Sequence, residues 1–253
     1  MNSCGDSTHN RALIVASRRL TASKHNLERR IEGLRYGGWW RQLVEYFAGI
    51  HAPITDYRAA LSPTKFVDVC LPFSDVLGKA DEEWVEVLEA HLVLGGTSMS
   101  YPHRAEEDQH RLLDMLNTYT DESATLVQRC DAAHYIQVGE LPVYAAYEGK
   151  NRVELYQYLG KSIKAFVRRT AYPGPSSLRV ERTFPFGHYV LICTEHFAAG
   201  GREIRILPFP EAVLPLLSAY GVSISQRRSQ FMPFSHLRCR DARRRVTGDQ
   251  MFP

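Results

Sequence analysis

The sequence predicts an α/β (α+β) fold: a small mixed sheet around a strand–Gly-x-x-Arg–helix–strand core, with a helical insertion and a helical N-terminal extension. Three observations predict it. The chain has 253 residues, 44% of them hydrophobic, which is enough to bury one large core. Apolar residues recur at helical spacing in some segments and alternate in others. Glycines separate the two kinds of segment.

Residues 1–64 are predicted to form the helical N-terminal extension. The polar residues 1–10 are expected to be disordered. Apolar residues at helical spacing predict one helix over residues 24–34 and a second over residues 39–50. The pair Gly37-Gly38 separates the two helices.

The main domain is predicted over residues 65–225. The alternation from residue 65 to 71 predicts an opening strand. Residues 81–94 are predicted to be a helix with Asp81 as its N-cap, and residues 106–119 a further helix. These two helices make up a helical insertion at about residues 80–130.

The part of the chain after residue 130 alternates strands, glycines and helices. Strands over 135–138 and 142–147 lead into Gly149, a helix over 151–159 follows, and Gly160 precedes a strand over 163–167. This order predicts a βαβ unit with short connections. Three further strands and one helix are predicted at 178–182, 188–194, 203–207 and 211–220.

The turn at Gly149 is the candidate functional site. Glycine lets a backbone approach a ligand closely, and the first N–H groups of a helix lack intrahelical partners, which suits phosphate. Lys150 and Arg152 would bind phosphate, with Asn151 as a further hydrogen-bond donor. Glu148 would hold a metal ion or act as a base. The alternative is an ordinary turn between a strand and a helix that carries surface charges.

Residues 141–155, followed by Leu159-Gly160 and the strand at 163–167, resemble the core of the ParB/sulfiredoxin-like superfamily. Residues 67–77 are similar to its opening strand and the short helix after it. The resemblance implies that the Gly149 turn binds nucleotide phosphates. Members variously cleave DNA, bind or hydrolyse nucleoside triphosphates, phosphorylate a small substrate, or reduce a cysteine sulfinate.

The chain departs from this family pattern inside the turn. Many members have an acidic residue or a histidine between the glycine and the arginine, where this sequence has Lys150 and Asn151. Glu148 is displaced by one position, which weakens its assignment as a catalytic carboxylate. The sulfiredoxin activity requires a cysteine in the turn, and its absence excludes that activity.

Charge is distributed unevenly along the chain. Residues 68–148 carry 4 basic and 16 acidic groups, whereas residues 149–253 carry 17 basic and 7 acidic groups. Residues 226–253 are predicted to be a basic tail that binds DNA or RNA through phosphate attraction and base stacking. Its arginines are Arg227, Arg228, Arg238, Arg240, Arg243, Arg244 and Arg245. The alternative is that the basic ends of the chain pack against the acidic middle.

The sequence favours a cytoplasmic protein without a membrane span. No run of about 18 apolar residues is present, and the five cysteines are scattered, as expected for free thiols. No protein metal site is predicted, although Mg²⁺ would accompany a nucleoside triphosphate.

The function expected from these observations is nucleotide or nucleic-acid phosphate handling. An NTPase or a DNase would use Glu148 and Arg152 as its catalytic residues. The alternative is a non-catalytic interaction protein of a plasmid or phage type that binds DNA or a DNA-processing partner.

Overall fold

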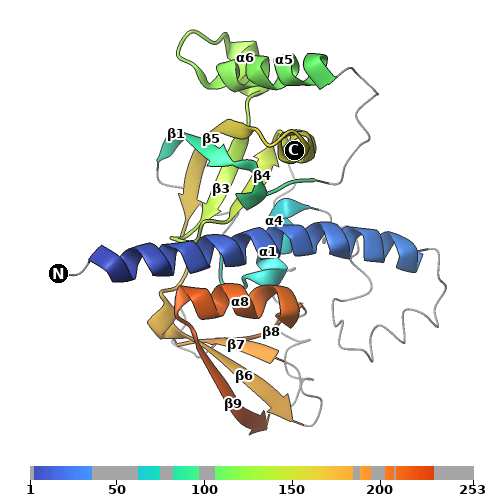
Figure 1. Ribbon diagram of the computed structural model, residues 1–253. Helices are drawn as coiled ribbons and strands as arrows, with labels where there is room; N and C mark the ends of the chain where they lie inside the picture. The colour runs from blue at the N-terminus through green and yellow to red at the C-terminus, as the bar shows by residue number, and fades with distance from the viewer. Residues whose placement is uncertain are drawn as a thin grey trace, which may run out of the picture.

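The protein has an α+β fold with two mixed sheets (Figure 1). This computed structural model describes residues 3–35, 62–74, 82–96, 106–184, 189–194, 203–207 and 209–230. The predicted helix at 39–50 lies outside these residues. The α+β class is confirmed, but the prediction of one sheet is wrong, because residues 178–230 build a second sheet of their own.

The first sheet has five strands in the order β1-β5-β3-β4-β2. Their bounds are β1 Glu83–Glu89, β2 Val93–Leu94, β3 His134–Val138, β4 Tyr144–Glu148 and β5 Ser162–Thr170. β3 pairs antiparallel with β4 and parallel with β5, so β4 and β5 run in opposite directions. The predicted βαβ unit is therefore wrong: its two strands are not parallel, and β3 lies between them.

The second sheet has four strands in the order β8-β7-β6-β9. The three predicted strands are confirmed as β6 Leu178–Phe184, β7 Tyr189–Cys193 and β8 Glu203–Leu207, and the helix as α8 Pro210–Tyr220. The strand β9 Ser223–Gln230 pairs in parallel with β6. The basic tail was predicted to start at residue 226, which lies inside β9. Arg227 and Arg228 therefore belong to this strand.

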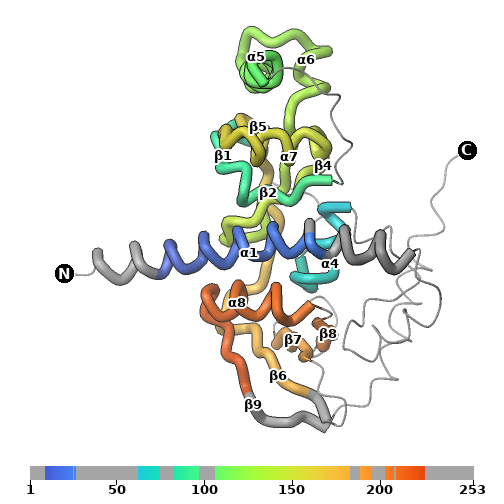
Figure 2. Tube along the Cα trace, turned by 45° about the vertical axis from the view of Figure 1, so that its right-hand side comes forward, coloured from blue at the N-terminus to red at the C-terminus, as the bar shows by residue number. Residues whose placement is uncertain are grey.

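Helix α1 (Ser3–Arg35) lies between the two sheets (Figures 1 and 2). Leu13, Ala16 and Leu20 are buried in a core that also contains Val213 and Leu217 of α8. Residues 3–10 are helical, so the prediction that they are disordered is wrong. The predicted helix at 24–34 is only the second half of a much longer one.

Polar side chains in the buried stripe of α1 explain why the sequence did not predict the whole helix. Ser17, Thr21 and Lys24 are buried beside Ala16 and Leu20. These five residues lie on one face of the helix, but only Ala16 and Leu20 among them are apolar. A search for apolar periodicity therefore finds too few residues to predict a helix.

Of residues 65–71, predicted as a strand, residues 65–70 belong to helix α4 (Pro63–Cys70) and Leu71 is its C-cap. Ser62 precedes the helix in an extended conformation and Pro63 occupies its first turn, where the missing N–H costs nothing. Phe66 and Cys70 are buried one helical turn apart. The segment matched to the opening strand of the ParB/sulfiredoxin-like superfamily is thus a helix.

Residues 81–94, predicted as a helix, contain β1, a 3-10 turn η2 (Ala90–Leu92) and β2. The apolar residues Trp84, Leu88 and Leu92 are four apart, and a spacing of four fits one face of a strand as well as of a helix. β1 pairs antiparallel with β5 along its whole length. The insertion therefore adds an edge strand to the first sheet before it becomes helical.

One face of the first sheet is covered by helices. Helix α5 (Glu106–Asn117), as predicted, packs Leu113 and Leu116 against it. Helix α7 (Val153–Tyr158) adds Val153 and Tyr156 to the same cluster. A short helix α6 (Leu126–Cys130) connects α5 and η3 (Thr118–Thr120) to β3. In the part of the chain that the structure describes, no helix has the length and apolar character needed to cross a membrane.

Candidate functional site

The Gly149 turn lies where the sequence predicts it, between a strand and a helical segment. β4 ends at Glu148, and Gly149 adopts a left-handed conformation with φ of 70°. The 3-10 helix η4 (Lys150–Arg152) follows and leads into α7. A left-handed residue is strained for any side chain with a Cβ, so glycine is required here by the backbone.

A glycine pair that the sequence did not assign to the site supports the turn. The N–H of Gly96 donates to the carbonyl of Lys150 at 2.9 Å. A Cβ atom on Gly95 would lie 2.8 Å from Cβ of Val153, and one on Gly96 would lie 2.9 Å from Oδ1 of Asn151. The turn therefore packs directly on the backbone that follows β2. The Gly95-Gly96 pair follows the predicted helix at 81–94 directly in the sequence, and nothing in its local pattern links it to a turn more than 50 residues away.

Arg152 is bonded to the protein itself. Its Nη1 donates to the main-chain carbonyl of Asp131 at 2.8 Å, and its Nη2 forms an ion pair with the Asp131 carboxylate. The side chain of Arg152 is 23% exposed. This two-point contact ties the turn to the segment between α6 and β3, so Arg152 fixes the position of the turn. Asp131 was not recognised from the sequence, because nothing in its local pattern indicates a partner 21 residues away.

Lys150, Asn151 and Glu148 are the exposed groups of the turn. Within the described residues, no ion pair is formed by Lys150 or Glu148. Lys150 is therefore the cation that remains for an external anion. Helix α7 has only six residues, so its dipole adds little to the attraction, and the side chains must supply most of it.

The described residues contain no group of three or more His, Cys, Asp or Glu side chains that could hold a metal ion. A Mg²⁺ ion at this turn would have to be bound through the phosphates of a nucleotide, with Glu148 as the nearest carboxylate in the sequence.

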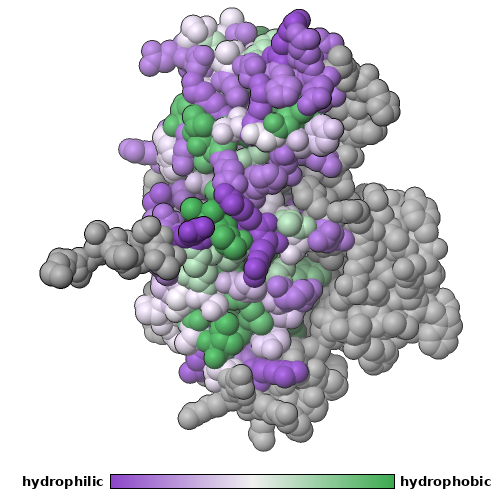
Figure 3. Space-filling model, in the orientation of Figure 1, coloured by the Kyte–Doolittle hydropathy of each residue, from purple (hydrophilic) through white to green (hydrophobic). Residues whose placement is uncertain are grey.

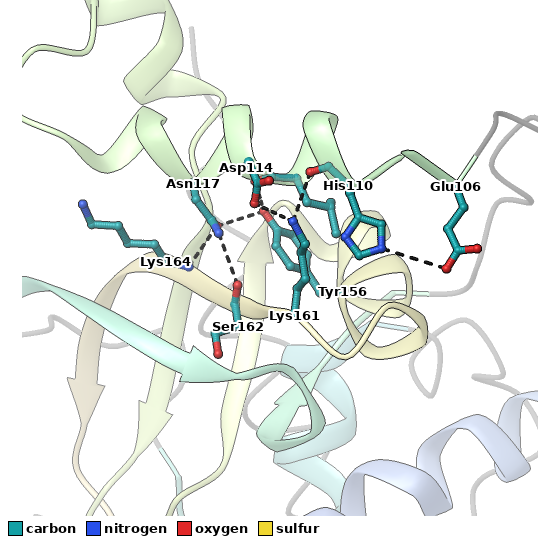
Figure 4. Close-up of polar contacts among 9 residues, drawn as sticks. Glu106, His110, Asp114, Asn117, Tyr156, Lys161, Ser162 and Lys164 are labelled. Carbon is teal, nitrogen blue, oxygen red and sulfur yellow. Dashed lines mark hydrogen bonds and ion pairs between the residues drawn. The ribbon is translucent and has the colours of Figure 1, made fainter. Parts of the chain in front are cut away.

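Polar side chains join α5 to α7 and β5, as Figure 4 shows. Asn117 donates to the carbonyl of Ser162 at 3.2 Å and accepts from the hydroxyl of Tyr156 at 3.0 Å. Lys161 donates to Asp114 at 2.6 Å. These groups satisfy one another, so this cluster stabilises the packing of α5 and is not a candidate site.

The structural role of Arg152 yields a stability prediction. Replacement of Arg152 by alanine removes two hydrogen bonds of a charged group and should lower the free energy of unfolding by about 1–2 kcal/mol. In a double-mutant cycle, Arg152→Ala and Asp131→Ala should cost less together than the sum of the two. Urea denaturation measures this, with Arg111→Ala on the exposed surface of α5 as the control. Additive effects would contradict the coupling.

The remaining predicted nucleic-acid residues lie at the end of the chain. Arg227 and Arg228 are in β9, whose backbone pairs with β6. Arg238, Arg240, Arg243, Arg244 and Arg245 lie outside the described residues. The tail therefore stays a prediction, and removing it after residue 225 would also remove most of β9.

Comparison with known proteins finds no family model, no curated protein and no solved structure that this chain matches. The resemblance to the ParB/sulfiredoxin-like superfamily stays a prediction.

Proposed function

We propose that the protein binds the phosphate groups of a nucleotide or a nucleic acid at the Gly149 turn, and that it acts by binding and not by turnover. The observation that carries the proposal is the left-handed Gly149 at the end of β4, which is followed at once by exposed Lys150 and Asn151. A compact run of N–H groups after such a residue, beside an ammonium group, suits an anion.

Two features favour binding over catalysis. The guanidinium of Arg152 is held by Asp131 and would have to leave that carboxylate before it could contact a transferring phosphoryl group. Glu148 is an exposed carboxylate that forms no ion pair within the described residues. The described part of the Gly149 turn thus offers a cation and amide donors to an anion.

We also propose that the protein is located in the cytoplasm. Cys70 and Cys193 are buried free thiols, and burial raises the pKa of Cys70. A protonated, inaccessible thiol behaves as a small apolar side chain and is consistent with a reducing compartment.

Nucleotide binding tests the proposal, and Lys150 should carry a large share of it. ATP and ADP, each with and without Mg²⁺, should raise the melting temperature of the full chain, because a ligand that binds only the folded state stabilises it. Lys150→Ala should weaken this binding about tenfold, the loss of one charge-assisted contact. Lys65→Ala on the exposed face of α4 is the matched control and should change nothing.

Glu148→Gln separates binding from hydrolysis. If the turn only binds, removing a negative charge near the phosphates should leave the affinity unchanged or increase it. If Glu148 is a catalytic carboxylate, wild-type protein should release phosphate from ATP in the presence of Mg²⁺ and the variant should not. If wild-type protein releases phosphate and Glu148→Gln does not, the protein is an NTPase, and the proposal that it acts only by binding is wrong.

A further inference from the structure

Among the residues that the structure describes, no helix covers one face of part of the first sheet. Tyr135, Ala165 and Val167 belong to the cluster that packs under α5 and α7. Their neighbours His134 and Phe166 therefore lie on the opposite face, since side chains alternate along a strand. We call this side of β1, β5 and β3, together with Tyr147 near the end of β4, the open face.

The exposure of β1 shows that the open face is accessible. Val85 pairs with Phe166 and Val87 pairs with Lys164, so both valines lie on the open face. Val85 is 43% exposed and Val87 67% exposed. Figure 3 shows hydrophobic surface where β1 lies in Figure 1. The other half of this side, around Ala145 of β4, is buried with α1 and α4.

Aromatic rings and a guanidinium group line the inner part of the open face. The ring of His134 stacks on that of Phe166, with centroids 5.0 Å apart and an interplanar angle of 23°. The guanidinium carbon of Arg168 lies 5.6 Å from the ring centroid of Tyr147, which is itself 53% exposed. The open face thus offers flat π surfaces next to a cation.

These rings are continuous with the Gly149 turn. Tyr147 precedes Gly149 by two residues, and His134 pairs with Glu148 across the two strands. A Cβ atom on Gly149 would lie 3.4 Å from Cα of Ala133, the residue before His134. Tyr147 and His134 therefore lie next to the turn, one along β4 and the other across from its last residue on β3.

Most anionic groups near the open face are already paired. Glu83 contacts Nδ1 of His134 at 3.1 Å, and Asp121 forms an ion pair with Lys164. No carboxylate of the described residues pairs with Arg168 or Lys150. Two cations, Arg168 and Lys150, thus remain for a polyanion, beside the carboxylates of Glu148 and of Glu83, whose partner His134 is a cation only when it is protonated.

We propose that the open face and the Gly149 turn together bind a single-stranded nucleic acid. Its bases would stack on Tyr147 and the His134–Phe166 pair, and its phosphates would contact Arg168 and Lys150. Unpaired bases present free π faces to aromatic side chains, whereas the bases of a duplex are already stacked on one another. This inference rests on the proposed phosphate binding and names the ligand class.

The test compares three fluorescent ligands by anisotropy with the full chain at low salt. They are an oligothymidylate of about 20 nucleotides, an abasic oligonucleotide of the same length, and a duplex of the same length. Tyr147→Ala should weaken oligothymidylate binding about 5- to 100-fold, the loss of one stacked base, and leave the abasic ligand unchanged. Tyr158→Ala is the matched control, because Tyr158 is an exposed tyrosine of α7 at 79% and lies outside the open face.

Lys150→Ala separates phosphate binding at the Gly149 turn from base stacking on the open face. It should weaken the base-bearing and the abasic ligand alike, because it removes a phosphate contact. If Lys150→Ala weakens both ligands while Tyr147→Ala has no effect, base stacking on the open face is refuted and phosphate binding stands. If neither substitution has an effect, both proposals fail. A duplex that binds as tightly as oligothymidylate would also overturn single-strand selectivity.

Arg168→Ala gives a second readout on the same face. It should lower the affinity for oligothymidylate and flatten its dependence on salt, because one fewer counterion is released. Arg111→Ala on α5 should leave the salt dependence unchanged. Equal salt slopes for wild type and Arg168→Ala would remove Arg168 from the interface.

Discussion

Substitution of Leu20 by alanine is expected to lower the free energy of unfolding by about 2–5 kcal/mol, the usual cost of a cavity in a packed core. Leu20 has no exposed surface and lies on α1 in the core between the two sheets. The loss would be a large part of the total stability of a domain of this kind. Denaturation by urea measures it directly.

Val15→Ala on the same helix is the control for Leu20→Ala. Val15 is 42% exposed, so its truncation should change the stability by less than about 0.5 kcal/mol. If α1 were only an extension of an independent domain, as the sequence predicts, both substitutions would have small effects. An unchanged unfolding midpoint in Leu20→Ala would therefore contradict the position of α1 in the core.

Gly139→Ala is the second substitution with a large expected effect, about 2–5 kcal/mol. Gly139 follows β3 with φ of 52°, and a Cβ there would lie 2.6 Å from Cβ of Tyr172. Left-handed backbone costs about 1–2 kcal/mol for a residue with a side chain. Overpacking adds about 1–3 kcal/mol, since Cβ of Tyr172 cannot move without its backbone.

Gly160→Ala isolates the backbone part of this cost. Gly160 has φ of 62°, close to that of Gly139, but a Cβ there would meet no atom within 4 Å. Its substitution should cost only about 1–2 kcal/mol. Equal losses in the two alanine variants, compared by urea denaturation, would show that the contact with Tyr172 contributes nothing.

Local patterns in this sequence predict local structure well. The segment from β3 to β5 was predicted because its strands, its helix and the glycines at 149 and 160 follow one another within a few residues. The three strands and the helix after residue 177 are confirmed for the same reason. Glycine, proline or polar residues bound each of these elements in the sequence.

Elements whose burial depends on distant partners were predicted less well. The four-residue spacing in β1 fits a helix or a strand, and only its pairing with β5 decides between them. The stripe of α1 contains Ser17, Thr21 and Lys24, which are buried only because two sheets enclose the helix. Topology was missed for a related reason, since nothing in β4 or β5 indicates that β3 lies between them.

At the candidate site, too, features set by adjacent residues were predicted, and contacts between distant segments were not. Adjacent residues predict the order of strand, glycine and helix at Gly149, and this order is confirmed. The engagement of Arg152 with Asp131, the glycine pair behind the turn and the stacked rings of the open face all join segments far apart in the sequence. Those long-range contacts give Arg152 a positioning role, and phosphate binding by Arg152 stays a prediction.

The central claim is that phosphate binds at the Gly149 turn, and amide chemical shifts of the isotope-labelled full chain test it most directly. Titration with tripolyphosphate should give saturable shifts that are largest at Gly149, Lys150 and Asn151, and Lys150→Ala should weaken the binding about tenfold. Tripolyphosphate carries no base, so the result does not depend on stacking at the open face. Amide signals of these three residues that stay fixed throughout the titration would contradict the account.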